Sequence, residues 1–237
     1  MTPSPNSMNP SIPTTLEGTD RVSAFLSAAY GWMASGLAIT AGTAWFVAQS
    51  PTFVNVIAGN RLLFWGLLIG QLGLVFTLSA RVQKMAPATA AMLFILYSAL
   101  TGVTLSFVLL AFTGESVATT LFVTAGMFGG LCAYGTLTKR SLVGFGQFLF
   151  MGLIGVVLAS FVGIFWQNSA FQFVLSFIGV LVFTGLAAYD AQRLKAMALV
   201  APDDRIGSYA VVGALTLYLD FINLFMFLLR FTGDRRR

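Results

Sequence analysis

Seven stretches of about 20 apolar residues, separated by short polar segments, dominate this chain. A helix of about 20 residues rises roughly 30 Å, which is the thickness of the hydrocarbon core of a bilayer. Charged residues make up only 9% of the 237 residues, whereas soluble domains carry roughly 25%. The sequence therefore predicts an all-α, polytopic membrane protein with one bundle of seven transmembrane helices. We place these helices at 22–48, 61–80, 88–112, 116–137, 143–165, 170–198 and 207–229.

The two ends of the chain differ from the bundle in composition. Residues 1–21 are rich in Pro, Ser and Thr and have no apolar face, which predicts a disordered cytoplasmic tail. Residues 22–231 form the predicted seven-helix domain, and residues 232–237 form a basic C-terminal tail. The first apolar stretch lacks the basic start and short apolar core of a signal peptide, so we expect it to remain as a membrane span.

The basic residues predict which ends of the helices face the cytoplasm, because inner loops are enriched in Lys and Arg. If the N-terminus is cytoplasmic, the inner segments hold Arg21, Arg81, Lys84, Lys139, Arg140, Arg193, Lys195 and Arg205. The outer loops before the C-terminal tail then hold only Arg61. We therefore expect a multi-pass membrane protein with a cytoplasmic N-terminus. The arginines of the tail break this pattern, so the sequence leaves open whether the last helix crosses fully.

The residue inventory excludes several classes of function. The chain has no histidine and a single cysteine, Cys132, so the usual zinc motifs, histidine acid–base catalysis and an intramolecular disulfide are all absent. The net charge of +5 comes from basic residues that lie mostly in short loops. We interpret that charge as a topology signal that contacts lipid headgroups, and we predict no nucleic-acid partner. No organic cofactor is predicted either.

Asp190 and Asp220 are the acidic residues that we expect within or at the ends of the helices. Asp220 lies near the middle of the last span, where an ionised aspartate costs on the order of 3 kcal/mol. It should therefore face the bundle interior, hold a proton or find a partner. Asn223 lies one helical turn further on, on the same face. If the sixth helix continues to Pro202, Asp190 lies below the cytoplasmic surface and can meet Asp220 from the neighbouring helix.

Two carboxylates that meet in such a place cannot easily both be ionised, so the pair would be a proton sensor and a cation pathway. It would also be a weak, tentative calcium site, since calcium prefers about six to eight oxygen ligands. Arg81 ends the second span and could latch a carboxylate, although a plain topology signal explains it equally well. Gln71 and Asn223 are candidates for lining the pathway, with a simple helix–helix hydrogen bond as the alternative for Gln71.

Four stretches of the chain resemble the bacterial branch of the Bax inhibitor-1 family, also called TMBIM. They are LGLVFTLSARVQKM, LFILYSALTGVTLSFV, AAYDAQRLK and LYLDFINLFMFLLR, and the resemblance covers nearly all of residues 22–231. It implies a seven-helix fold with a central last helix and a pH-sensitive calcium leak, located for a bacterial member in the inner membrane. Asp190 and Asp220 match the paired aspartates of the family, and Arg81 resembles the arginine that latches its closed state. Gln71 departs from relatives with a glutamate nearby, which puts a further acidic calcium ligand in doubt.

Two other functions remain open. Tyr189 and Asp190 match the first motif of intramembrane aspartyl proteases, whose second motif is Gly-x-Gly-Asp. This chain has Leu217, Tyr218 and Leu219 before Asp220, so that match is weak. A non-conducting regulator that binds other membrane proteins is the remaining alternative. We expect a leak for calcium ions, controlled by protons, and no enzymatic activity.

Overall fold

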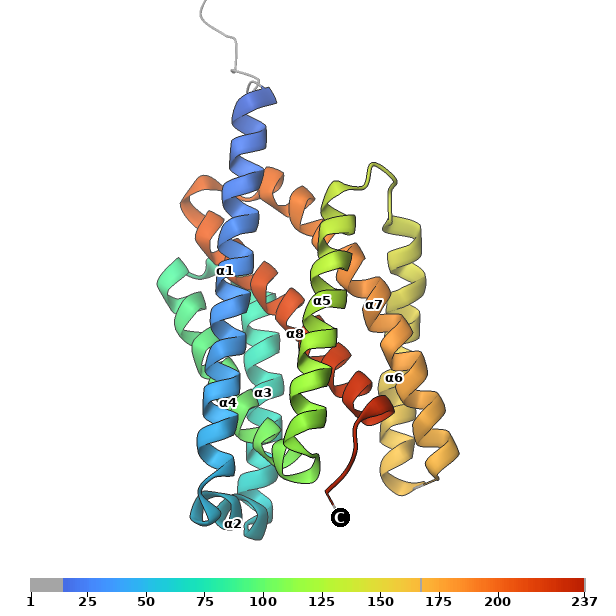
Figure 1. Ribbon diagram of the computed structural model, residues 1–237. Helices are drawn as coiled ribbons and strands as arrows, with labels where there is room; N and C mark the ends of the chain where they lie inside the picture. The colour runs from blue at the N-terminus through green and yellow to red at the C-terminus, as the bar shows by residue number, and fades with distance from the viewer. Residues whose placement is uncertain (1–14, 167, 237) are drawn as a thin grey trace, which may run out of the picture.

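The computed structural model describes residues 15–166 and 168–236 and shows a bundle of helices (Figure 1). The helices are α1 (Thr15–Ala48), α2 (Pro51–Gly59), α3 (Arg61–Arg81), α4 (Pro87–Ala111), α5 (Gly114–Leu137), α6 (Val143–Phe165), α7 (Ser169–Val200) and α8 (Ile206–Thr232). Two single turns, η1 (Val82–Lys84) and η2 (Asp203–Arg205), precede α4 and α8. Seven of the helices in the described residues are long and apolar enough to cross a membrane, which confirms the predicted fold class.

The boundaries differ from the prediction mainly at the N-terminus. Helix α1 begins at Thr15, so residues 15–21 of the predicted tail are helical, whereas residues 1–14 lie outside the described residues. Helix α2 was not predicted, and its 9 residues are too few to span a bilayer. Helix α7 continues to Val200, as the apolar residues after Asp190 suggested.

Local sequence signals fix several of the helix starts. Asn60 and Asn168 act as N-caps, because each side chain accepts backbone N–H groups of the first turn of α3 and α7, respectively. Pro51 and Pro87 lie in the first turn of α2 and α4, where proline needs no hydrogen-bonded N–H. These residues therefore mark where the polar connections end and the spans begin.

Helix α8 lies at the centre of the bundle and packs on α1, α4, α5 and α7 (Figure 1). Helix α3 packs on α4, and α6 packs on α7, so these two helices form an outer layer. Of the apolar window in each span, 61% is buried in α8, against 39% in α7 and 6% in α3. The central position of the last helix is therefore confirmed.

Helices α5 and α7 approach each other closely at Gly135. A Cβ atom built on Gly135 would collide with the backbone carbonyl of Ala188 in α7. Only glycine allows such an approach, as in many membrane helix pairs. Because Ala188 lies two residues before Asp190, this contact fixes α7 against the bundle beside the predicted site.

The connections gather at two ends of the bundle (Figure 1). We call the end that holds the start of α1, η1, η2 and residues 138–142 the basic end. The opposite end, which we call the α2 end, holds α2 and the α4–α5 connection. The C-terminal tail lies there, because Thr113 N donates to Asp234 O and Arg236 N donates to Ala111 O. Helix α8 therefore runs from one end of the bundle to the other, which the sequence had left open.

The two ends can be assigned to the two sides of the membrane by cysteine labelling. In a Cys132→Ser background, we expect a membrane-impermeant thiol reagent to label Arg236→Cys in intact cells and to leave Lys139→Cys unlabelled, because basic loops stay inside. Permeabilised cells provide the control, since both positions are exposed and should then react. Labelling of residue 139 together with protection of residue 236 in intact cells would reverse the orientation.

Candidate functional site

Asp190 of α7 and Asp220 of α8 lie side by side in the interior of the bundle. Only 6% and 5% of their surfaces are exposed, respectively. Their side chains are close enough for the two carboxyl groups to influence each other. The meeting of the two carboxyl groups therefore depends on the packing of α7 on α8, one of the most extensive helix contacts in the bundle.

The pair has few other partners. Arg193 Nη1 lies 3.9 Å from Asp190 Oδ1, one turn further along the same helix. This distance is too long for a hydrogen bond. The contact between Asp190 and Arg193 also lies within α7, so it does not join two helices. Asp220 Oδ2 is buried without a hydrogen-bond partner in the described residues. A buried carboxylate oxygen in this condition is a natural position for a proton, a water molecule or a cation.

A cavity of about 280 Å³ connects Asp190 with the basic end of the bundle. Its walls come from α3 and η1, from α7 and from α8; they include Ser79, Val82, Asp190, Arg193, Met197, Tyr209 and Thr216. Because Arg193 is exposed and lines this cavity, water can approach Asp190 from the basic end. In the other direction, α8 continues with buried Leu224, Phe227 and Leu228. These apolar side chains separate the aspartates from the α2 end.

The structure does not bring Arg81 to the aspartates. Arg81 is the exposed last residue of α3, and no ion pair joins it to an acidic residue within the described part of the chain. The reason is the position of α3, which packs mainly on α4 in the outer layer of the bundle. Ser79 and Val82, on either side of Arg81 in the sequence, do line the cavity.

Gln71 and Asn223 do not line this cavity. The Gln71 side chain donates to Leu100 O at 3.0 Å and to Thr104 Oγ1 at 2.5 Å, and both acceptors belong to α4. It thus makes the simple helix–helix hydrogen bonds that were the alternative for this residue. Asn223 donates to Leu219 O of its own helix.

Arg21, and not Arg81, is the arginine that joins separate helices at the basic end. Its Nε donates to Ala198 O at 2.9 Å, and its Nη2 donates to Ala201 O, both at the end of α7. Its Nη1 pairs with Asp203 of η2. We call these contacts the Arg21 clasp, which ties α1 to the end of α7. A cation is favourable there because the last carbonyls of a helix lack partners within the helix.

Sequence reasoning missed the Arg21 clasp because its partners lie 177 to 182 residues away along the chain. Arg21 was interpreted only as a topology signal. A basic residue in the first turns of a helix is common, and no local pattern indicates which carbonyl groups it will meet. Only the packing of α1 beside α7 provides that information.

The two aspartates alone offer too few ligands to hold a metal ion tightly. In the described residues, no group of three or more His, Cys, Asp or Glu side chains could hold a metal ion. Asp190 and Asp220 together offer four carboxylate oxygens, whereas calcium takes about six to eight oxygen ligands. A calcium ion at the pair would therefore keep several water molecules and bind weakly.

Comparisons with known proteins agree with this architecture. The model of the family described as inhibitor of apoptosis-promoting Bax1 matches residues 22–237. The Escherichia coli K12 protein named inner membrane protein YbhL is 49% identical over 215 residues, which cover 90% of this chain and 92% of the relative. Uncharacterized proteins of Borreliella burgdorferi and Deinococcus radiodurans are 43% and 42% identical, and each match covers at least 90% of both chains.

The Arg21 clasp should contribute measurably to stability. Arg21→Ala removes three contacts of a charged donor, so we expect a loss of ~1–3 kcal/mol and a lower melting temperature of the purified protein. Lys84→Ala, at an exposed residue of the same end, is the matched control and should have little effect. Equal melting temperatures for the two variants would show that the clasp contributes nothing.

Proposed function

The chain belongs to the Bax inhibitor-1 family, and on this premise we propose that it is a pH-sensitive leak for calcium ions in the inner membrane. The seven apolar helices support a multi-pass membrane protein. The name of the Escherichia coli relative supports the inner membrane as its location. The observation that carries the proposal is the buried pair of Asp190 and Asp220, which a cavity reaches from one end of the bundle.

The charge state of the aspartate pair influences how α7 and α8 pack. Protons can therefore change this packing by binding to the pair. Two ionised carboxylates repel each other in a poorly solvated interior, and one shared proton removes that repulsion. A change of protonation therefore shifts the balance between closed and open arrangements of the two helices. Since α8 contacts four other helices, a shift at Asp220 affects the whole bundle.

Protonation has two opposite effects on flux. It removes the repulsion between the two carboxylates, and we propose that the resulting packing of α7 on α8 favours the open arrangement. It also removes carboxylate charge that attracts the cation. We therefore expect calcium flux to rise as the pH falls from neutral and to decline again at lower pH, when both carboxylates hold protons.

Asparagine substitutions test the role of the pair, because they keep the shape of the side chain and remove its ionisation. Asp190→Asn and Asp220→Asn should each flatten the pH dependence of calcium flux into proteoliposomes. The double variant should add little to either single variant, since the two residues act as one unit. Glu115→Gln, at an exposed acid in the first turn of α5, is the control and should keep the wild-type profile. A wild-type profile in both single variants would exclude the pair as the sensor.

The roles of Arg193 and Arg81 can be separated by the same flux measurement. Arg193→Ala removes the cation nearest to Asp190, so we expect it to shift the pH at which flux is half-maximal. Arg81→Ala should leave that pH within experimental error, because Arg81 contacts neither aspartate in the closed arrangement. If Arg81→Ala raised basal flux while Arg193→Ala did not, Arg81 would be the latch, as its resemblance to the family arginine implies.

A further inference from the structure

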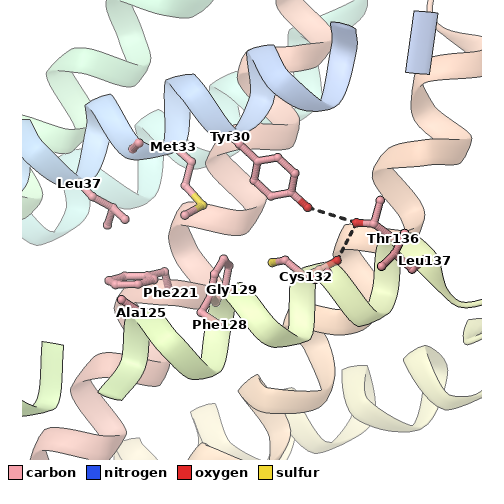
Figure 2. A pocket seen from close by; sticks show the side chains of 12 residues that line it. Tyr30, Met33, Leu37, Ala125, Phe128, Gly129, Cys132, Thr136, Leu137 and Phe221 are labelled. Atoms are coloured by element: carbon pink, nitrogen blue, oxygen red, sulfur yellow. Dashed lines mark hydrogen bonds between the residues drawn. The ribbon is translucent and has the colours of Figure 1, made fainter. Parts of the chain in front are cut away.

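A second hollow lies on the side of the bundle, away from the aspartate cavity. It is a groove of about 640 Å³ between α1 and α5, within the range of roughly 300–1,000 Å³ that is typical of ligand sites. Figure 2 shows Met33 and Leu37 of α1 facing Phe128 and Cys132 of α5, with Phe221 of α8 between them. Helices α1 and α5 both pack on α7 and α8, and the groove lies between α1 and α5 with α8 at its floor.

The groove opens towards the surroundings of the bundle. Ala34, Gly129 and Ala133 line it and are exposed, and a Cβ atom on Gly129 would meet no atom within 4 Å. Both helices span the membrane, so the medium outside this opening is hydrocarbon. The lining of α5 runs from Ala125 to Leu137, about 18 Å at 1.5 Å per residue. The hydrocarbon part of one leaflet is half of a core of about 30 Å. The lining of α5 is slightly longer than this half.

One end of the groove carries two hydroxyl groups, and basic residues lie near it. The Tyr30 hydroxyl lies 3.3 Å from Thr136 Oγ1, as Figure 2 shows. Lys195 Nζ donates to Thr136 O at 2.6 Å. Because Thr136 is one residue from the end of α5, these groups lie at the basic end, at headgroup depth. An ammonium group has three donors and one is used here, while Lys139 and Arg140 follow in the connection.

We propose that the α1–α5 groove binds one anionic phospholipid of the leaflet at the basic end. One acyl chain lies between α1 and α5, and the headgroup phosphate lies beside Lys195 and the Tyr30 hydroxyl. The length of the groove and its apolar walls fit the acyl chain. The basic residues near its end fit the phosphate of the headgroup. Since Phe221 follows Asp220 directly in α8, the bound chain contacts the residue next to the buried pair.

Native mass spectrometry of the purified full-length protein tests this site with phosphatidylglycerol and phosphatidylethanolamine as probes. We expect the wild type to retain one phosphatidylglycerol in preference to phosphatidylethanolamine. Gly129→Leu and Ala133→Leu fill the groove and should each weaken this binding by roughly tenfold, which is about 1.4 kcal/mol. Gly130→Leu is the matched control, because Gly130 is exposed on the same helix and does not line the groove. The control should bind as the wild type does.

The headgroup contact is tested separately. Lys195→Gln keeps a donor for Thr136 O and removes the charge, so it should abolish the preference for phosphatidylglycerol. Lys84→Gln removes a charge at the same end, away from the groove, and should leave the preference unchanged. Wild-type binding in both groove-filling variants would overturn the proposal, as would equal retention of the two lipids by the wild type. A loss of dimers instead of lipid in the groove-filling variants would also overturn it, and would assign the groove to a second copy of the chain.

Discussion

The cost of placing carboxylates in a poorly solvated bundle governs this structure. Asp220 lies on the most buried helix and cannot reach either surface, so its charge must be balanced inside the protein. The structure places a second carboxyl group, Asp190, beside it, and two ionised carboxylates repel each other. Such a pair is tolerated best when it holds a proton or a passing cation. The proposed sensitivity of the site to pH and to cations follows from this arrangement.

Access to the aspartate pair differs between the two ends of the bundle. The cavity reaches Asp190 from the basic end, whereas buried leucine and phenylalanine side chains of α8 close the way to the α2 end. The Arg21 clasp holds the end of α7 against α1 at the open side of this arrangement. A shift of α7 relative to α8 would alter the pair, the cavity wall and the clasp together, because all three share the second half of α7.

Much of the fold and part of the site could be predicted from the sequence. Apolar stretches fix the spans, and two aspartates are rare enough in such stretches to stand out. Contacts between distant segments could not be predicted. Helix α5 is apolar around most of its circumference, so its sequence does not show that Gly129 and Ala133 face an open groove. The partner of an arginine such as Arg21 or Arg81 depends on which helices become neighbours, and the sequence does not encode this locally.

The most direct measurement of the central claim is the sidedness of pH control in oriented proteoliposomes. Calcium flux is recorded while the pH is lowered on one side at a time, with orientation established by labelling of a cysteine at residue 139. If the aspartate pair is the sensor, acid on the side of the basic end should change the flux at once, because the cavity reaches Asp190 from there. Acid on the side of the α2 end should have little effect. Control of the flux from the α2 end alone would contradict the account.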